Sequence, residues 1–104
     1  MIIYNVTIQV DPDIHQEWLS WMQEKHIPDV LVTGCFMESR ISRMFAEEDT
    51  GITYSIQYTA ENQEAITQYL NLYAEALQKD HHLRYQDRYV AFRSMMEVVT
   101  IHFP

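Results

Sequence analysis

The stretch MIIYNVTIQVDPDIHQEWLSWMQEKHIP, residues 1–28, sets the expectation for the whole fold. From Ile2 to Val10, apolar residues occupy every second position, which is typical of a β-strand with one apolar face. Asp11 can cap a following helix, and Pro12 suits the first helical position. At about 100° per residue, one arc of that helix then carries Ile14, Trp18, Leu19, Trp21 and Met22. The stretch therefore predicts a strand followed at once by an amphipathic helix.

The end of this helix is marked by a proline. Pro28 disfavours helical geometry at Ile27, so we expect the helix to break or kink there. Residues 29–33 are consistent with another short turn, and Gly34 is a natural helix cap.

Three more strands and one more helix are expected downstream. A β-hairpin is expected first, and its polar turn is Glu47 to Gly51. Asn62 can cap the second helix, which keeps its apolar spacing from Ile66 to Leu77 and weakens at residues 79–82. The expected strands are residues 35–45, 52–59 and 89–101.

The order β-α-β-β-α-β predicts an α+β, ferredoxin-like fold. Four antiparallel strands would carry two helices on one face, and residues 1–104 would form a single domain of this type. The apolar strand faces would meet the helices.

The opposite face of the sheet is expected to be only partly polar. Exposure to solvent is expected for its polar residues, namely Asn5, Thr7, Gln9, Thr53, Ser55 and Gln57. However, an apolar set is expected on the same face, namely Ile3, Cys35, Met37, Ile41, Phe45, Val90 and Phe92. A second copy packed sheet against sheet would cover it, and the stretch from Met95 to Ile101 would pair with or wrap that partner. We therefore expect a two-fold homodimer, with a monomer as the alternative.

Composition excludes several classes of partner. The net charge is −8, only seven residues are Lys or Arg, and no basic run exists. This argues against nucleic acid and against an anionic membrane surface. The single cysteine, Cys35, cannot form an intrachain disulfide, which fits a reducing compartment. The alternating N-terminus is unlike a signal segment, and no apolar run approaches the roughly 20 residues of a membrane helix. A soluble cytoplasmic protein is expected.

These features resemble the dimeric α+β barrel proteins, which include antibiotic-biosynthesis monooxygenases and EthD-like proteins. The resemblance is carried by the element order, by an aromatic-rich first helix ending in the His-x-Pro of His26 to Pro28, and by the strand after Gly34. The segments MIIYNVTIQVD, HIPDVLVTGCF and YVAFRSMMEV look like a small family of unknown function within this superfamily. The resemblance implies the fold and the dimer. Some members oxidise aromatic substrates without metal or flavin, and many only bind a ligand.

The EthD-like pattern also places an aromatic pair shortly before the His-x-Pro. Here Trp18 and Trp21 precede His26. Trp21 lies five positions before the histidine instead of the usual four, which turns it by about 100° on an α-helix.

His26 is the candidate catalytic residue. An imidazole has an ordinary pKa of about 6.5, so a neutral His26 beside an apolar cavity could accept a proton. The structural alternative is a histidine that caps helix-end carbonyls or bonds a neighbouring backbone group.

Aromatic residues suggest a pocket for a planar apolar ligand. The candidate ligand-binding residues are Tyr4, Trp18, Trp21, Met22, Tyr54, Tyr58, Tyr69, Tyr73 and Arg93. For the aromatic residues the alternative is an ordinary core with tyrosine hydroxyls at its rim. Arg93 suggests recognition of an anion such as a substrate carboxylate, and its alternative is an ion pair between strands or subunits.

No metal or cofactor is expected. No CxxC, HxH or HExxH spacing exists. His15 and His26 would stand roughly 16 Å apart on a continuous helix, which is too far to share an ion.

Three classes of function remain open. The first is a dimeric protein that binds a small apolar or aromatic molecule or acts as a scaffold. The second is a cofactor-independent enzyme, monooxygenase-like or isomerase-like, with His26 as acid and base. The third is a module that binds a protein partner through its acidic surface or an exposed strand edge.

Overall fold

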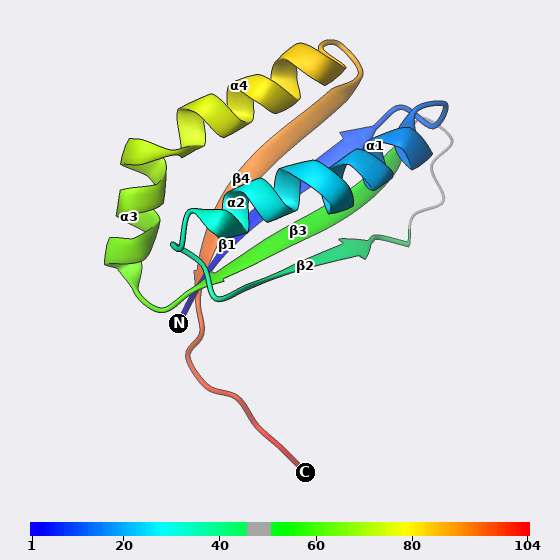
Figure 1. Cartoon of the computed structure of the whole chain (residues 1–104). Helices are drawn as coiled ribbons and strands as arrows, with labels where there is room; N and C mark the ends of the chain where they lie inside the picture. Colours follow the sequence, from blue (N-terminus) through cyan, green and yellow to red (C-terminus); the bar gives the residue numbers. More distant parts are fainter. Residues whose placement is uncertain (46–50) are drawn as a thin grey trace.

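Four antiparallel strands form one sheet, and every helix covers the same face of it (Figure 1). This computed structural model describes residues 1–45 and 51–104. The strand order β2-β3-β1-β4 confirms the predicted ferredoxin-like topology. The elements are β1 (Ile2–Val10), α1 (His15–Trp21), α2 (Ile27–Val32), β2 (Glu38–Arg43), β3 (Ile52–Ala60), α3 (Gln63–Leu72), α4 (Ala74–Tyr85) and β4 (Tyr89–Glu97).

The first helix does not break at Ile27, so of the two predicted outcomes the break is wrong; its winding changes in the turn just before that residue. A π-helical turn, Met22–His26, connects α1 to α2, and the Ile27 N–H donates to the carbonyl of Met22 five residues earlier. Pro28 then occupies the first turn of α2. A proline ring inside an α-helix clashes with the carbonyl four residues before it, and the wider π turn accommodates the ring without ending the helix. Gly34 ends α2 with a φ of 78°, which confirms its predicted role as a cap.

The second strand is shorter than expected. Cys35 and Phe36 are buried in the core before β2 begins, so their placement in a strand is wrong. Ile41 lies opposite Ile56, which faces the helices, and it therefore also faces them and not the other side of the sheet. Phe45 lies beyond the end of β2 and is fully exposed. The predicted turn at 47–51 lies largely outside the described residues.

The second helical segment is longer than expected. Asn62 caps α3 by accepting a hydrogen bond from the Ala65 N–H at 3.0 Å, as predicted. Helical structure then continues in α4 through residues 79–82 because Ala74, His81 and Tyr85 share a buried side. The last strand ends at Glu97, whereas residues up to 101 were expected to extend it.

The core lies between the sheet and the helices. Trp18 is fully buried and packs on Tyr54, with ring centroids 5.0 Å apart. Tyr4, Phe36 and Tyr69 form a second aromatic cluster nearer the other end of the sheet, with centroids 4.9 to 6.2 Å apart. The apolar strand faces predicted from period-two spacing do meet the helices.

The face of the sheet away from the helices, here called the open face, is mixed. At its centre, the Asn5 side chain bonds the hydroxyls of Thr7, Ser55 and Ser94. Around this polar centre, large apolar side chains of β4 are exposed, with Val90 at 65% and Phe92 at 64%. The strand register places Ile3, Val90 and Phe92 on this face, as predicted.

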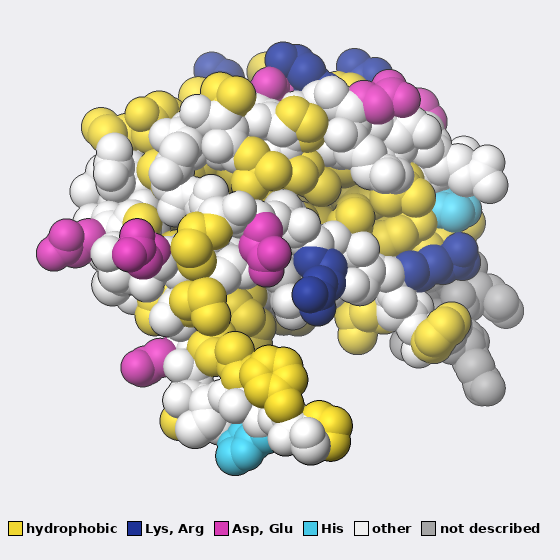
Figure 2. Space-filling view, turned by 60° about the horizontal axis from the view of Figure 1, so that its bottom comes forward, with side chains coloured by type: hydrophobic (Ala, Val, Ile, Leu, Met, Phe, Trp, Pro, Cys, Tyr) yellow, Lys and Arg dark blue, Asp and Glu magenta, His cyan; other side chains and the backbone are white. Residues whose placement is uncertain are grey.

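The Val98 N–H still donates to the Met1 carbonyl at 2.9 Å, and the residues after it project away from the body of the molecule (Figure 1). Val99, Ile101 and Phe103 alternate along this tail and are 85%, 59% and 85% exposed. Figure 2 shows hydrophobic side chains along the projecting segment. Apolar residues at every second position are typical of a strand that lacks a partner.

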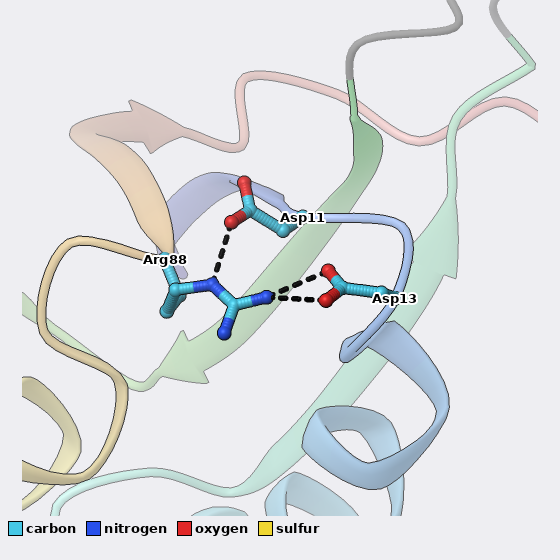
Figure 3. A network of polar contacts seen from close by, with 3 residues as sticks. All are labelled: Asp11, Asp13 and Arg88. Carbon is cyan, nitrogen blue, oxygen red and sulfur yellow. Dashed lines mark hydrogen bonds and ion pairs between the residues drawn. The ribbon is translucent and has the colours of Figure 1, made fainter.

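Arg88 ties the start of the first helix to the start of β4 (Figure 3). Its guanidinium bonds the carboxylates of Asp11 at 2.7 Å and Asp13 at 2.6 Å, and its carbonyl accepts the Asp11 N–H at 3.0 Å. The hydrogen bond from Arg88 lowers the pKa of the Asp13 carboxyl. These contacts join the segment before α1 to the segment between α4 and β4.

We predict that Trp18→Ala lowers the free energy of unfolding by about 3–5 kcal/mol, because it removes a fully buried indole from the core. Chemical denaturation followed by circular dichroism measures the change. Leu83→Ala is the control, since Leu83 is 66% exposed on α4 and its loss should change stability by less than about 0.5 kcal/mol. A near-neutral Trp18→Ala would contradict the core assignment.

Candidate functional site

A cavity of about 40 Å³ lies between the sheet and the helices, and we call it the central cavity. This volume holds a few water molecules or one small polar group. Most of its wall is apolar or aromatic. The residues that line it are Tyr4, Val6, Ile8, Met22, His26, Ile56, Tyr58, Tyr69, Gln78, His81, Tyr89, Ala91 and Arg93.

A wider groove adjoins this cavity, and we call it the outer groove. Its volume is about 590 Å³, which is enough for a small aromatic molecule. Four residues line both spaces, namely Gln78, His81, Tyr89 and Arg93. The groove is completed by Leu70, Ala74, Glu75, Lys79 and His82. A ligand could therefore place a ring system in the groove and a small group in the cavity.

His26 reaches the cavity from the π-helical turn. Its ring lies 5.4 Å from the ring of Trp21, centroid to centroid. The Nδ1 atom is buried and has no hydrogen-bond partner among the described residues. Burial lowers the pKa of the imidazole, although the charges of Asp80 and Asp29 partly offset this effect. His26 is therefore neutral at neutral pH and keeps unused hydrogen-bonding capacity inside the protein.

His81 reaches the same cavity from α4. The indole N–H of Trp18 donates to Nε2 of His81 at 2.9 Å, so this nitrogen carries a lone pair and the neutral ring has its proton on Nδ1. Burial, followed by the influence of His26 and Arg93, lowers the pKa of His81 to about 4. The two imidazole rings lie 5.7 Å apart, so the cavity holds a pair of neutral histidines.

A polar cluster forms at the β4 side of the cavity. Burial raises the pKa of the Tyr4 hydroxyl, and the positive charge of Arg93, followed by the polar side chains of Arg93 and Gln78, opposes this rise. Burial also raises the pKa of the Tyr58 and Tyr69 hydroxyls. In the described part of the chain, no carboxylate forms an ion pair with Arg93. The guanidinium is therefore left available to an anion.

The structure brings six of the ten predicted site residues to the central cavity. These are Tyr4, Met22, His26, Tyr58, Tyr69 and Arg93.

The other four predicted residues lie elsewhere. Trp18 is core, and Trp21 lies beneath the guanidinium of Arg84 at 5.2 Å. The Tyr54 hydroxyl lies 3.1 Å from Nδ1 of His15 in a different groove, beside β2. Tyr73 packs at the edge of the core, between α3 and α4.

Sequence reasoning missed His81, Gln78 and Tyr89. A usable signal existed for His81, because Ala74, His81 and Tyr85 recur at seven and four residues and so share a helix face. The polar run from Lys79 to His82 concealed that spacing.

The arrangement can bind and orient a molecule and can accept a proton. Two neutral imidazoles, one guanidinium and aromatic walls supply these capacities. Within residues 1–45 and 51–104, no three His, Cys, Asp or Glu side chains come together as a metal site would require.

The sequence of this chain matches a known protein family. Residues 1–99 match the family model described as a domain of unknown function, DUF4286. Among curated proteins, no sequence matches significantly. Across the described residues, no helix is long and apolar enough to span a membrane.

Solved structures with the same fold are distant in sequence. A dimeric ferredoxin-like protein from an uncultured marine organism is 9% identical with a TM-score of 0.75, and the match covers all of both chains. An EthD family protein from Bacillus halodurans is 14% identical with a TM-score of 0.69 over 95% of this chain and all of its own. SnoaB, a cofactor-independent oxygenase from Streptomyces nogalater, is 11% identical with a TM-score of 0.64 over 96% of this chain and 95% of its own. At these identities the likeness shows the fold, and it confirms the predicted resemblance.

We predict that His81 makes the protein less stable in mild acid. The pKa of His81 is about 4 in the folded protein, and in the unfolded chain it takes its ordinary value of 6.5. Between pH 4 and 6.5 the unfolded chain therefore binds a proton that the folded chain does not. Stability should fall as the pH drops from 6.5 to 4, by on the order of 3 kcal/mol from this residue, and its contribution should be flat below 4.

The test is the free energy of unfolding as a function of pH for wild type and His81→Gln, which keeps an acceptor for the Trp18 indole. The variant should lose the part of the slope between pH 6.5 and 4 that His81 contributes, while the lowered pKa of His26 keeps a remainder. His102→Gln, a change in the exposed tail, is the control and should behave as wild type. Equal slopes for wild type and His81→Gln would show that His81 is not held neutral.

Proposed function

The chain belongs to the DUF4286 family, a domain of unknown function, and on this premise we propose that it is a homodimer that binds a small apolar or aromatic molecule. The ligand would occupy the outer groove and reach into the central cavity. The observation that carries this proposal is the buried Nδ1 of His26, which has no partner among the described residues although it lines a cavity.

An unpartnered polar atom inside a protein costs about 1–3 kcal/mol, and folded proteins rarely retain one without a reason. Around His26 the aromatic side chains pack closely, yet the space beside it is left open. The imidazole lines the central cavity, and a rotation of the ring would be enough to turn Nδ1 towards a ligand group or a water there. This supports binding more than it supports an ordinary core.

The dimer is supported by surface that the single chain leaves uncovered. Val90, Phe92 and Met96 are exposed on the open face, and the tail adds Val99, Ile101 and Phe103. A second copy packed on the open face would bury these side chains, and the tail would pair with or wrap it. One of the fold neighbours is itself described as dimeric. The free, buried Cys35 fits the reducing cytoplasm that we propose as the location.

A second candidate is a cofactor-independent enzyme in which His26 takes a proton from the bound molecule. The observation that favours it is an imidazole that burial keeps neutral at the wall of the cavity. The fold neighbour SnoaB is described as a cofactor-independent oxygenase, which makes such chemistry compatible with this fold. Binding is common to both candidates and is therefore tested first.

We predict that 1-naphthol binds and shifts the ring resonances of His26, because the ligand hydroxyl would enter the central cavity. Proton–carbon NMR of the histidine rings during titration measures the shift. Ala91→Phe should abolish it by filling the cavity, whereas Ala76→Phe on the exposed side of α4 should not. Binding that leaves the His26 resonances unchanged would exclude this cavity as the site.

We predict a solution mass of about 25 kDa, twice the 12.4 kDa chain, because the exposed apolar surface of the open face would be buried in a dimer. Light scattering after size exclusion measures it. Phe92→Arg should give a 12.4 kDa species, while Leu83→Arg, at a residue that is equally exposed but lies on α4, should stay dimeric. A wild-type mass of 12.4 kDa at micromolar concentration would refute the dimer.

A further inference from the structure

Arg93 stands where the central cavity meets the outer groove, because it lines both. No carboxylate of the described residues forms an ion pair with it. We propose that the ligand is an aromatic hydroxy acid, whose carboxylate binds the Arg93 guanidinium and whose hydroxyl occupies the central cavity beside His26. This inference rests on the proposed function and names the chemical class of its ligand.

The guanidinium of Arg93 supports the carboxylate. It is charged at every physiological pH and presents several N–H donors in a planar fork that matches a carboxylate. The position is also accessible, since the Arg93 side chain is exposed at the groove and not buried in the core.

Local charge favours an anion although the whole chain carries a net charge of −8. The groove has two cationic side chains, Arg93 and Lys79, and one carboxylate, Glu75. At physiological salt the Debye length is about 8 Å, so exposed carboxylates on the rest of the surface are largely screened.

His26 supports the hydroxyl. A neutral imidazole has one donor and one acceptor nitrogen, and the tautomer decides which role the buried Nδ1 has. A hydroxyl both donates and accepts, so it would bond Nδ1 in either tautomer once the ring rotates to turn this atom towards the cavity. The cavity volume of about 40 Å³ also suits a hydroxyl and is too small for a ring.

The two anchors lie close enough to belong to one ligand. His26, His81 and Arg93 all line the central cavity, so one molecule can contact both the guanidinium and the imidazoles. The ring would lie in the outer groove against Leu70, Ala74 and Tyr89, which supply its apolar surface. A planar molecule that carries a hydroxyl and a carboxylate would therefore have an anchor for each group.

The test compares three probes at pH 7.5 by isothermal titration: 3-hydroxy-2-naphthoate, 2-naphthoate and 2-naphthol. They share the ring system and differ in which of the two groups they carry. We expect 3-hydroxy-2-naphthoate to bind about tenfold or more tightly than 2-naphthol, because a hydrogen bond to a charged group contributes at least that much. We expect 2-naphthoate to lie between them.

Variants assign each group to its residue. Arg93→Gln should weaken both carboxylates about tenfold and leave 2-naphthol unchanged, and Arg93→Lys should restore part of the loss. Lys79→Gln removes the other groove cation and should weaken the carboxylates less than Arg93→Gln does. His26→Phe should remove the advantage of 3-hydroxy-2-naphthoate over 2-naphthoate. Circular dichroism confirms that each variant is folded.

The outcomes separate this inference from the proposed function. If 2-naphthol binds and shifts the His26 resonances while the carboxylates gain nothing, the hydroxy-acid assignment fails and the binding site stands. If Lys79→Gln and not Arg93→Gln removes the preference for the carboxylate, the role given to Arg93 is overturned. If none of the probes binds the folded dimer, the proposed function and this inference both fail.

Discussion

The hydrogen bond from the Trp18 indole to His81 joins the two helical segments above the sheet, and the site depends on it. The inner side of α4 carries Gln78 and His81, and these polar side chains do not pack tightly against apolar strands. Polar contacts add to the packing of Ala74 and Tyr85 in the core: Tyr85 donates to Glu17 at 3.1 Å, and Nδ1 of His82 lies 2.8 Å from the Tyr89 hydroxyl. The central cavity remains where Gln78 and His81, between these packed residues, face the strands.

The π-helical turn explains how this chain keeps an aromatic ring beside its histidine. Trp21 and His26 are five residues apart. On an α-helix, a tryptophan five residues before the histidine would be turned by about 100° from one that is four residues before it. The turn forms a hydrogen bond between residues five apart, and the two rings come to lie 5.4 Å from one another. The extra residue is thus absorbed by a local change in winding. Pro28, which follows directly, accounts for the place where the winding changes.

The sequence was sufficient for the topology because periodicity records which face of an element is buried. The alternation from Ile2 to Val10 and the cap at Asn62 predicted their elements correctly. It was not sufficient for β2, because the assignment of Ile41 to a face depends on a register that only the pairing with Ile56 reveals. Nor did it predict His81, since its neighbours on the helix are polar and its environment is made by Trp18, 63 residues away in the chain. Six of the ten site residues could be predicted from the sequence. Their arrangement could not, because ring positions and the burial of polar atoms depend on tertiary contacts.

The side chains of strand β4 alternate between two faces, and this alternation separates the proposed ligand site from the proposed dimer interface. Tyr89, Ala91 and Arg93 point to the side of the central cavity, while Val90, Phe92 and Ser94 lie on the open face, as the register with β1 requires. A partner on the open face would therefore leave the side chains at the outer groove uncovered. At the same time, β4 is an edge strand with only one neighbour in its own sheet, so its position is held from one side. A partner packed against Phe92 would steady the strand that carries Arg93, which gives the proposed dimer a physical reason to influence the ligand site without contributing a residue to it.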